Sequence, residues 1–115
     1  MIDQYASLTG NWNYPTKIRF GAGRISELAD ACRAAGIRRP LLVTDPGLKP
    51  LPMIMDAIGT LEHAGIACAL FADVHPNPVG ADVEAGLKMF RANKNDGVIV
   101  FGGGSAMDAG KAIAF

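Results

Sequence analysis

The sequence predicts an α/β fold in which a parallel β-sheet carries helices on both faces. Short apolar stretches typical of buried strands occur at residues 40–44, 66–71 and 98–101. Stretches with apolar residues three or four positions apart alternate with them. Strand–helix–strand units in tandem need right-handed crossovers, which produce a parallel sheet with helices packed against it. Half of the 115 residues are apolar, which is enough for a core.

The first part of the chain contains one predicted strand and one predicted helix. Residues 1–12 show no clear period, and residues 10–13 look like a loop. Residues 16–20 alternate polar and apolar side chains, as in a half-buried strand. Residues 24–35 are predicted to form an amphipathic helix that ends at Gly36. Its apolar stripe consists of Ile25, Leu28, Ala29 and Cys32.

Two further helices are expected to cover the sheet. One starts near Pro52 and stops at Gly65, and the other spans residues 81–93. The apolar stripe of the first consists of Ile54, Ile58 and Leu61, and that of the second consists of Val83, Leu87 and Phe90. Each stripe is wide enough to bury one helix face.

Charge and cysteine usage argue against several classes of partner. Eleven basic and eleven acidic residues cancel, so neither nucleic acid nor a charged membrane surface is expected as partner. No apolar run approaches the roughly twenty residues of a membrane helix. Cys32 and Cys68 lie in apolar patterns without a preceding secretory signal, so we expect buried free thiols in a cytoplasmic protein. His63 and His75 lack spaced Cys, Asp or Glu neighbours, so no metal site is expected.

A glycine-rich segment follows the last predicted strand. Gly102, Gly103 and Gly104 allow a tight turn with accessible backbone N–H groups, and the residues from Ser105 onward are mostly good helix formers. With Ser105 as N-cap, the glycines would lie at a helix N-terminus. Unpaired N–H donors and the positive end of the helix dipole favour a phosphate there.

Two well-known phosphate-binding patterns do not fit this segment. The Walker pattern fails because five residues, not four, separate its glycines, and because Ser or Thr does not follow Lys111. The dinucleotide pattern G-x-G-x-x-G has Met107 in place of its third glycine. What remains is Gly-Gly-Gly-Ser-x-x-Asp-x-x-Lys, in which Asp108 and Lys111 share one helix face. A simple glycine turn beside a surface ion pair is the alternative.

Two other polar residues follow predicted strands, and ligands of parallel sheets bind beyond the carboxyl ends of the strands. Asp45 comes directly after residues 40–44, where a carboxylate could accept both hydroxyl protons of a ribose. Asp-Pro-Gly is also a good turn, so a turn-forming role is equally open. Asn77 lies in an extended proline segment after residues 66–71, where an ordinary loop role is the alternative.

The chain resembles the iron-containing (metal-dependent, group III) alcohol dehydrogenases. The resemblance rests on the segment Gly-Gly-Gly-Ser-x-x-Asp-x-x-Lys at 102–111, on Thr44-Asp45, and on Pro76-Asn77-Pro78. Tyr14-Pro15 and the segment Phe20-Gly21-Ala22-Gly23 also match the start of the family. It implies a Rossmann-like dinucleotide-binding domain, followed in the whole protein by a helical domain that holds a divalent metal.

The resemblance also implies a cofactor site. Asp45 would bind the adenosine ribose, Asn77 would lie beside the cofactor cleft, and Asp108 would bind or orient groups near the inner half of the cofactor. The pyrophosphate would rest on the backbone of Gly103, Gly104 and Ser105. The expected cofactor is NAD rather than NADP, because a carboxylate at Asp45 repels an extra phosphate. No residue of this chain matches the family's metal ligands or catalytic groups.

We therefore expect residues 1–115 to be the dinucleotide-binding part of an NAD-dependent alcohol dehydrogenase, inactive alone and truncated inside a helix at Phe115. The metal, iron or zinc, would be held in the helical domain, which this sequence lacks. The substrate would be a small alcohol or aldehyde, and the family resemblance favours a dimer. A glycerol-dehydrogenase or dehydroquinate-synthase-like relative and a stand-alone nucleotide-binding module are the alternatives.

Overall fold

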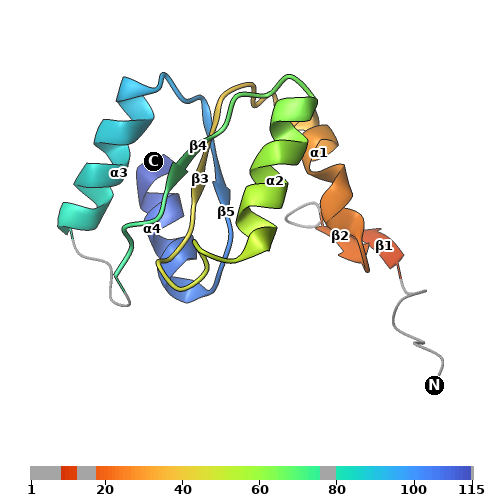
Figure 1. The fold of residues 1–115 in the computed structure, drawn as a ribbon, viewed down its shortest axis with the longest axis horizontal. Coiled ribbons are helices and arrows are strands. Elements are labelled where there is room, and N and C mark those ends of the chain that lie inside the picture. The colour runs from red at the N-terminus through yellow and green to blue at the C-terminus, as the bar shows by residue number, and fades with distance from the viewer. Residues whose placement is uncertain (1–8, 13–17, 76–79, 115) are drawn as a thin grey trace.

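The computed structural model describes residues 9–12, 18–75 and 80–114, and its centre is a three-stranded parallel sheet (Figure 1). The strands are β3 (Pro40–Val43), β4 (Ala69–Phe71) and β5 (Gly97–Val100), in the spatial order β4-β3-β5. Leu41 pairs with both Ala69 and Val98, so β3 is the central strand. This confirms the predicted parallel α/β sheet.

In the described part of the chain, four α-helices cover the two faces of this sheet (Figure 1). The helices α1 (Leu28–Ala34) and α2 (Pro52–His63) pack on one face, and α3 (Gly80–Ala92) and α4 (Gly104–Ala114) pack on the other. Leu41 and Val43 belong to the core beneath α3 and α4, whereas Leu42 belongs to the core beneath α2. Successive residues of a strand point to opposite faces, so β3 is buried on both sides.

The stripe predicted for the second helix is correct, since Ile54, Ile58 and Leu61 are all buried on α2. The helix predicted at 24–35 begins later than expected. Residues Arg24–Glu27 form the 3₁₀ turn η1, and Ile25 is 59% exposed. Glu27 accepts hydrogen bonds from the Arg24 and Arg19 side chains at 2.7 and 3.2 Å, and these bonds hold the turn at the surface. The buried stripe therefore starts at Leu28.

A strand lies where the sequence favoured a loop. The strand β1 (Thr9–Trp12) pairs antiparallel with β2 (Ile18–Gly21), and the two form a separate hairpin beside α1 (Figure 1). The part of the predicted strand 16–20 that is described lies in β2. The prediction of a loop at 10–13 is wrong for residues 10–12, because pairing with β2 satisfies their backbone.

The remaining strands agree with prediction except in length. The strand predicted at 66–71 is ordered as β4 only from Ala69, since Ile66 first closes the end of α2 by donating its N–H to the carbonyl of Leu61 at 2.9 Å. Cys32 is buried, Cys68 is half-buried, and both are free thiols. No helix among the described residues is long and apolar enough to cross a membrane.

Candidate functional site

The carboxyl ends of β3 and β5 mark the point where the connections of the sheet change face. The chain leaves β3 toward α2 on one face of the sheet and leaves β5 toward α4 on the other face. Adjacent parallel strands whose connections diverge in this way leave a gap beyond their carboxyl ends, which is the usual ligand position in such sheets. Asp45 follows β3 and Gly102 follows β5, so both predicted segments border this gap.

The carboxylate of Asp45 has two different surroundings. Its Oδ1 accepts the N–H of Leu48 at 2.9 Å, and its backbone carbonyl accepts the N–H groups of Leu48 and Lys49 at 3.2 and 3.1 Å. Asp45 is therefore a turn former, as one of the two interpretations predicted. Its Oδ2 faces the other segment, because a Cβ placed on Gly102 would lie 3.2 Å from it. The turn thus orients the carboxylate toward the glycines.

Gly102 has a backbone conformation that only glycine adopts readily, with φ of 134°. A side chain there would also crowd Ala106 and Leu48, each 3.3 Å from the added Cβ. A Cβ on Gly103 or Gly104 would instead meet nothing within 4 Å, and all three glycines are exposed. Gly102 therefore makes the turn, while its two successors leave an open backbone surface.

The helix α4 begins earlier than the sequence suggested. Met107 donates its N–H to the carbonyl of Gly103 at 3.1 Å, so Gly103 is the N-cap and the predicted N-cap at Ser105 is wrong. Glycine is itself an acceptable N-cap residue, and three glycines in a row allow the helix to start at any of them. The N–H groups of Gly104, Ser105 and Ala106 then have no acceptor within the helix. They lie just beyond the carboxyl end of β5.

The start of α4 suits an anion for a second reason. Its first turn contains no acidic residue of its own, and the nearby carboxylate that the structure shows is that of Asp45, which faces Gly102. A diphosphate fits the residues present, since it needs backbone donors, positive potential and space without a Cβ. Exposed backbone and space without a Cβ occur together at Gly103 and Gly104, and the start of α4 adds the positive end of a helix dipole.

Small residues bring α4 close to the sheet behind the glycine turn. Ala106 and Ala109 are buried at 0% and 1% exposure, and a Cβ on Gly110 would collide with Cγ2 of Val100 in β5. In the dinucleotide pattern, the third glycine serves this close helix–strand packing. Gly110 takes that place here, whereas Met107 is 47% exposed. The sequence does not match the dinucleotide pattern at residue 107, but Gly110 provides the same close packing one turn further along α4.

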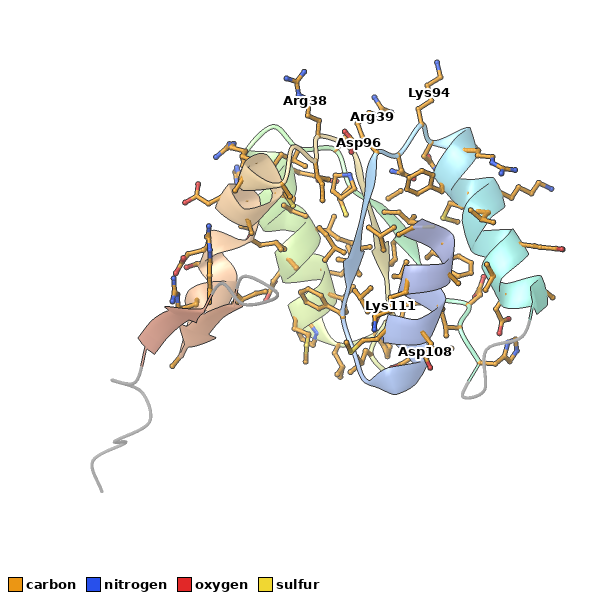
Figure 2. The ribbon with its side chains drawn as sticks, turned by 180° about the vertical axis from the view of Figure 1, so that it is seen from behind. Arg38, Arg39, Lys94, Asp96, Asp108 and Lys111 are labelled. Carbon is orange, nitrogen blue, oxygen red and sulfur yellow. The ribbon has the colours of Figure 1, made fainter. Side chains whose placement is uncertain are left out.

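Asp108 and Lys111 are exposed on α4, at the same end of the molecule as the glycine turn (Figure 2). In the described part of the chain, no ion pair joins Asp108 to Lys111, so the surface ion pair considered as an alternative is not formed. Asp108 lies one helical turn beyond Gly104. This position is compatible with contact to a ligand that extends along α4.

The proline segment after β4 is only partly described. Asn77 lies in residues 76–79, outside the described residues. His75 directly precedes residues 76–79 and is described. Its Nδ1 lies 2.6 Å from Oδ1 of Asp82, a residue that is 5% exposed in the first turn of α3. His63 is exposed at the end of α2. Within the described residues, no group of three or more His, Cys, Asp or Glu side chains could hold a metal ion.

Three grooves of the described structure lie away from the predicted site. A groove of about 480 Å³ opens at the amino ends of the strands, lined in part by Arg39, Glu62 and Cys68. Burial raises the pKa of the Cys68 thiol to about 11, so the thiol is protonated at neutral pH. The other two grooves border η1 with α1 and the α1–β3 turn. The glycine turn is an open surface rather than a closed cavity. We favour it over these grooves as the ligand site because backbone N–H groups at a helix N-terminus bind anions.

The sequence placed Gly102 in the turn but not among the cofactor-binding residues, and it did not point to Leu48. Gly102 has the positive φ and lies against the Asp45 carboxylate, and Leu48 packs beside both. The signal for Gly102 was its place as the first glycine after a buried strand. No signal in the sequence identified Leu48.

Comparisons with known proteins show which proteins this chain resembles in sequence and fold. The family described as iron-containing alcohol dehydrogenase matches residues 15–115. Choline dehydrogenase of Bacillus subtilis (strain 168) is 38% identical over 99 residues, which are 86% of this chain and 25% of that protein. The chain thus spans about a quarter of the length of the curated relatives it matches.

Two solved structures extend the comparison. The crystal structure of a 1,3-propanediol oxidoreductase superposes with a TM-score of 0.76 at 39% identity, over 80% of this chain and 24% of that one. Sulfoacetaldehyde reductase from Bifidobacterium kashiwanohense, solved in complex with NAD⁺, superposes with a TM-score of 0.75 at 33% identity. That match covers 82% of this chain and 24% of the reductase.

Proposed function

Because this chain belongs to the iron-containing alcohol dehydrogenase family, we propose that residues 1–115 form the NAD-binding α/β domain of an alcohol dehydrogenase. The observation that carries the proposal is that the Asp45 carboxylate, oriented by its own turn, faces the exposed glycine turn at the start of α4. A relative with the same fold over most of this chain was solved with NAD⁺, which supports the choice of ligand.

Different residues of this site would bind different parts of the cofactor. The backbone N–H groups around Gly103, Gly104 and Ser105 would bind the pyrophosphate, because they have no helical acceptor. Asp45 would accept the hydroxyl protons of the adenosine ribose with the carboxylate that its own turn orients. Asp108 would contact the inner half of the cofactor, and Asn77 would line its path.

The contribution of this chain to the reaction is binding and orientation. NAD supplies hydride exchange when bound, and a divalent metal, iron or zinc, would supply polarisation of the substrate oxygen from the helical domain. The described residues of this chain contain no suitable ligand cluster for that metal. No residue here is proposed as catalytic, so the domain alone should bind NAD without turnover.

The substrate of the whole protein would be a small alcohol or the corresponding aldehyde. Relatives whose names specify choline and 1,3-propanediol support this class.

We further propose a cytoplasmic homodimer. The free thiols support a reducing compartment, and the β1–β2 hairpin, which stands apart from the main sheet, supports an intersubunit role. Light scattering of the purified protein at micromolar concentration measures the subunit number.

The substitution Gly104→Asp tests the site. It adds a carboxylate in open space where the pyrophosphate would lie, so the dissociation constant for NAD should rise by at least about 100-fold, or about 2.7 kcal/mol. Isothermal titration measures binding, and circular dichroism checks the fold. Gly59→Asp adds the same charge at an open glycine of α2 and should leave binding unchanged. Unchanged binding by a folded Gly104→Asp variant would refute the site.

Cofactor choice gives a second test. The Asp45 carboxylate would repel the 2′-phosphate of NADP, so the parent protein should bind NAD at least about tenfold more tightly than NADP. Asp45→Asn keeps a side-chain oxygen for the Leu48 N–H and removes the charge. The preference should then fall toward unity in competition titrations. Equal affinity of the parent protein for both cofactors would contradict the role of Asp45.

A further inference from the structure

Thr44 connects the central strand to both of its neighbours and is completely buried, with 0% exposure. Its N–H donates to the carbonyl of Phe71 at 3.0 Å, and its hydroxyl donates to the carbonyl of Phe101 at 2.8 Å. The N–H of Phe101 donates in turn to the carbonyl of Val43 at 2.9 Å. Phe101 is thus held through both its backbone groups, immediately before the glycine turn.

The hydroxyl of Thr44 takes the place of a sheet hydrogen bond. A parallel ladder that continued past Val43 would offer the N–H of Asp45 to the carbonyl of Phe101. The Thr44 side chain donates to that carbonyl, so the ladder ends one residue earlier without leaving the acceptor unpaired. The backbone at Asp45 is then released from the sheet and can form the turn with Leu48.

We propose that Thr44 is a positioning residue that sets the separation between the Asp45 carboxylate and the glycine turn. The inference rests on the proposed function, because it assigns Thr44 a role in dinucleotide affinity rather than in folding alone. Without the hydroxyl, the carbonyl of Phe101 needs another donor. Either the N–H of Asp45 moves toward that carbonyl or the end of β5 moves away. Both movements change the distance between the Asp45 carboxylate, which would bind the ribose, and the glycine turn, which would bind the pyrophosphate.

The test compares three substitutions at residue 44 in the full-length protein. Thr44→Val keeps the shape of the side chain and removes the donor, and should raise the dissociation constant for NAD about tenfold. Thr44→Ser keeps the hydroxyl, and should stay within about twofold of the parent protein. Thr44→Cys replaces the hydroxyl with a weak donor and should resemble valine. It serves as the second variant if Thr44→Val does not fold.

Two matched controls separate positioning from stability. Thr60→Val removes a hydroxyl that donates to the carbonyl of Asp56 at 2.9 Å on the exposed side of α2, and should leave affinity unchanged. Ile66→Val trims a core side chain at the other end of the sheet, 5% exposed, and should lower the melting temperature without changing affinity. Titrations are performed well below each melting temperature.

The outcomes distinguish this inference from the proposed function. If the parent protein binds neither NAD nor ADP-ribose, the proposed function fails and this inference fails with it. If the parent protein binds NAD and the folded valine or cysteine variant binds equally well, only the positioning role fails. The role is also overturned if Thr44→Ser binds as weakly as Thr44→Val, since the hydroxyl would then not be the determinant.

Discussion

The two ends of the sheet treat their free backbone groups in opposite ways. At the amino end, three helices finish with a backbone hydrogen bond that closes the last turn. The N–H groups of Ile37, Ile66 and Asn95 donate at 2.8, 2.9 and 2.9 Å to carbonyls five residues earlier. At the carboxyl end, the first N–H groups of α4 have no acceptor within the helix.

The exposed charged side chains of the two ends also differ in their contacts. At the amino end, the carboxylate of Asp96 accepts the backbone N–H groups of Arg38 and Arg39 at 2.8 to 3.1 Å (Figure 2). At the other end, Asp108 and Lys111 form no ion pair with each other. Both ends use the protein's own atoms, since Asp45 accepts the Leu48 N–H at the carboxyl end. The difference is that the first N–H groups of α4 have no acceptor within the helix, and ligand binding is expected there.

The largest effect on stability is expected at Gly110, where α4 packs closely against Val100 of β5. Gly110→Ala puts a methyl group into Val100, so the free energy of unfolding should fall by about 2 kcal/mol. Urea denaturation measures it. The control Gly59→Ala places a methyl group in open space inside α2 and should stabilise the protein by about 0.5 to 1 kcal/mol. Equal changes from both substitutions would show that α4 does not depend on close contact with β5.

A smaller effect is expected at the closed end, from Asp96. The backbone N–H groups of Arg39 and Arg38 hold the pKa of the Asp96 carboxyl below its usual value. Asp96→Ala should lower the free energy of unfolding at pH 7 by about 1 kcal/mol, a value reduced by solvent exposure. Asp56→Ala, at an exposed position on α2, should change it by less than about 0.5 kcal/mol.

The pH dependence of the Asp96 effect has a defined sign. Because the folded pKa is lowered, the carboxylate stabilises the native state fully above the unfolded pKa of about 3.9. That contribution disappears as the pH falls through the lowered folded pKa. The difference between parent and Asp96→Ala should therefore shrink below about pH 4. A difference that stays constant down to pH 2 would mean that the carboxylate charge does not matter at this junction.

The smallest effect is expected at Lys94, which ends α3 in a conformation that glycine adopts at the ends of α1 and α2. Its φ is 52°, against 74° for Gly36 and 81° for Gly65. Lys94→Gly should stabilise the protein by about 0.5 to 1 kcal/mol by relieving this strain. Lys88→Gly, inside the same helix, should destabilise it by about 1 kcal/mol. A destabilising Lys94→Gly would mean that its side chain has a role beyond the turn.

The elements that the sequence predicted well are those whose buried residues form a pattern within the element itself. The central strand is apolar at every position because both of its faces are covered, and the stripe of α2 follows the helical period. The strand β1 was missed because Gly10 and Asn11 are typical of turns, and only pairing with distant residues of β2 makes them a strand. The N-cap was misplaced because Gly103 and Ser105 are both acceptable there.

The candidate site was predictable as a set of residues but not as an arrangement. Asp45 and the glycines were expected at one edge because parallel strands share a carboxyl end. That they are direct neighbours depends on β5 lying beside β3, which no local pattern specifies. The role of Thr44 depends on the same neighbour relation, since its partner Phe101 is 57 residues away.

That long separation has a consequence for synthesis of the protein. When β3 leaves the ribosome, the strand that will cover its far edge has not yet been translated, and the interval of 57 residues corresponds to roughly 3 to 11 seconds at ordinary elongation rates. During that time the buried strand β3 has at least one unpaired edge, and an unpaired strand edge can associate with other nascent chains. Slowing translation between residues 44 and 97 should therefore increase aggregation more than slowing it after residue 101.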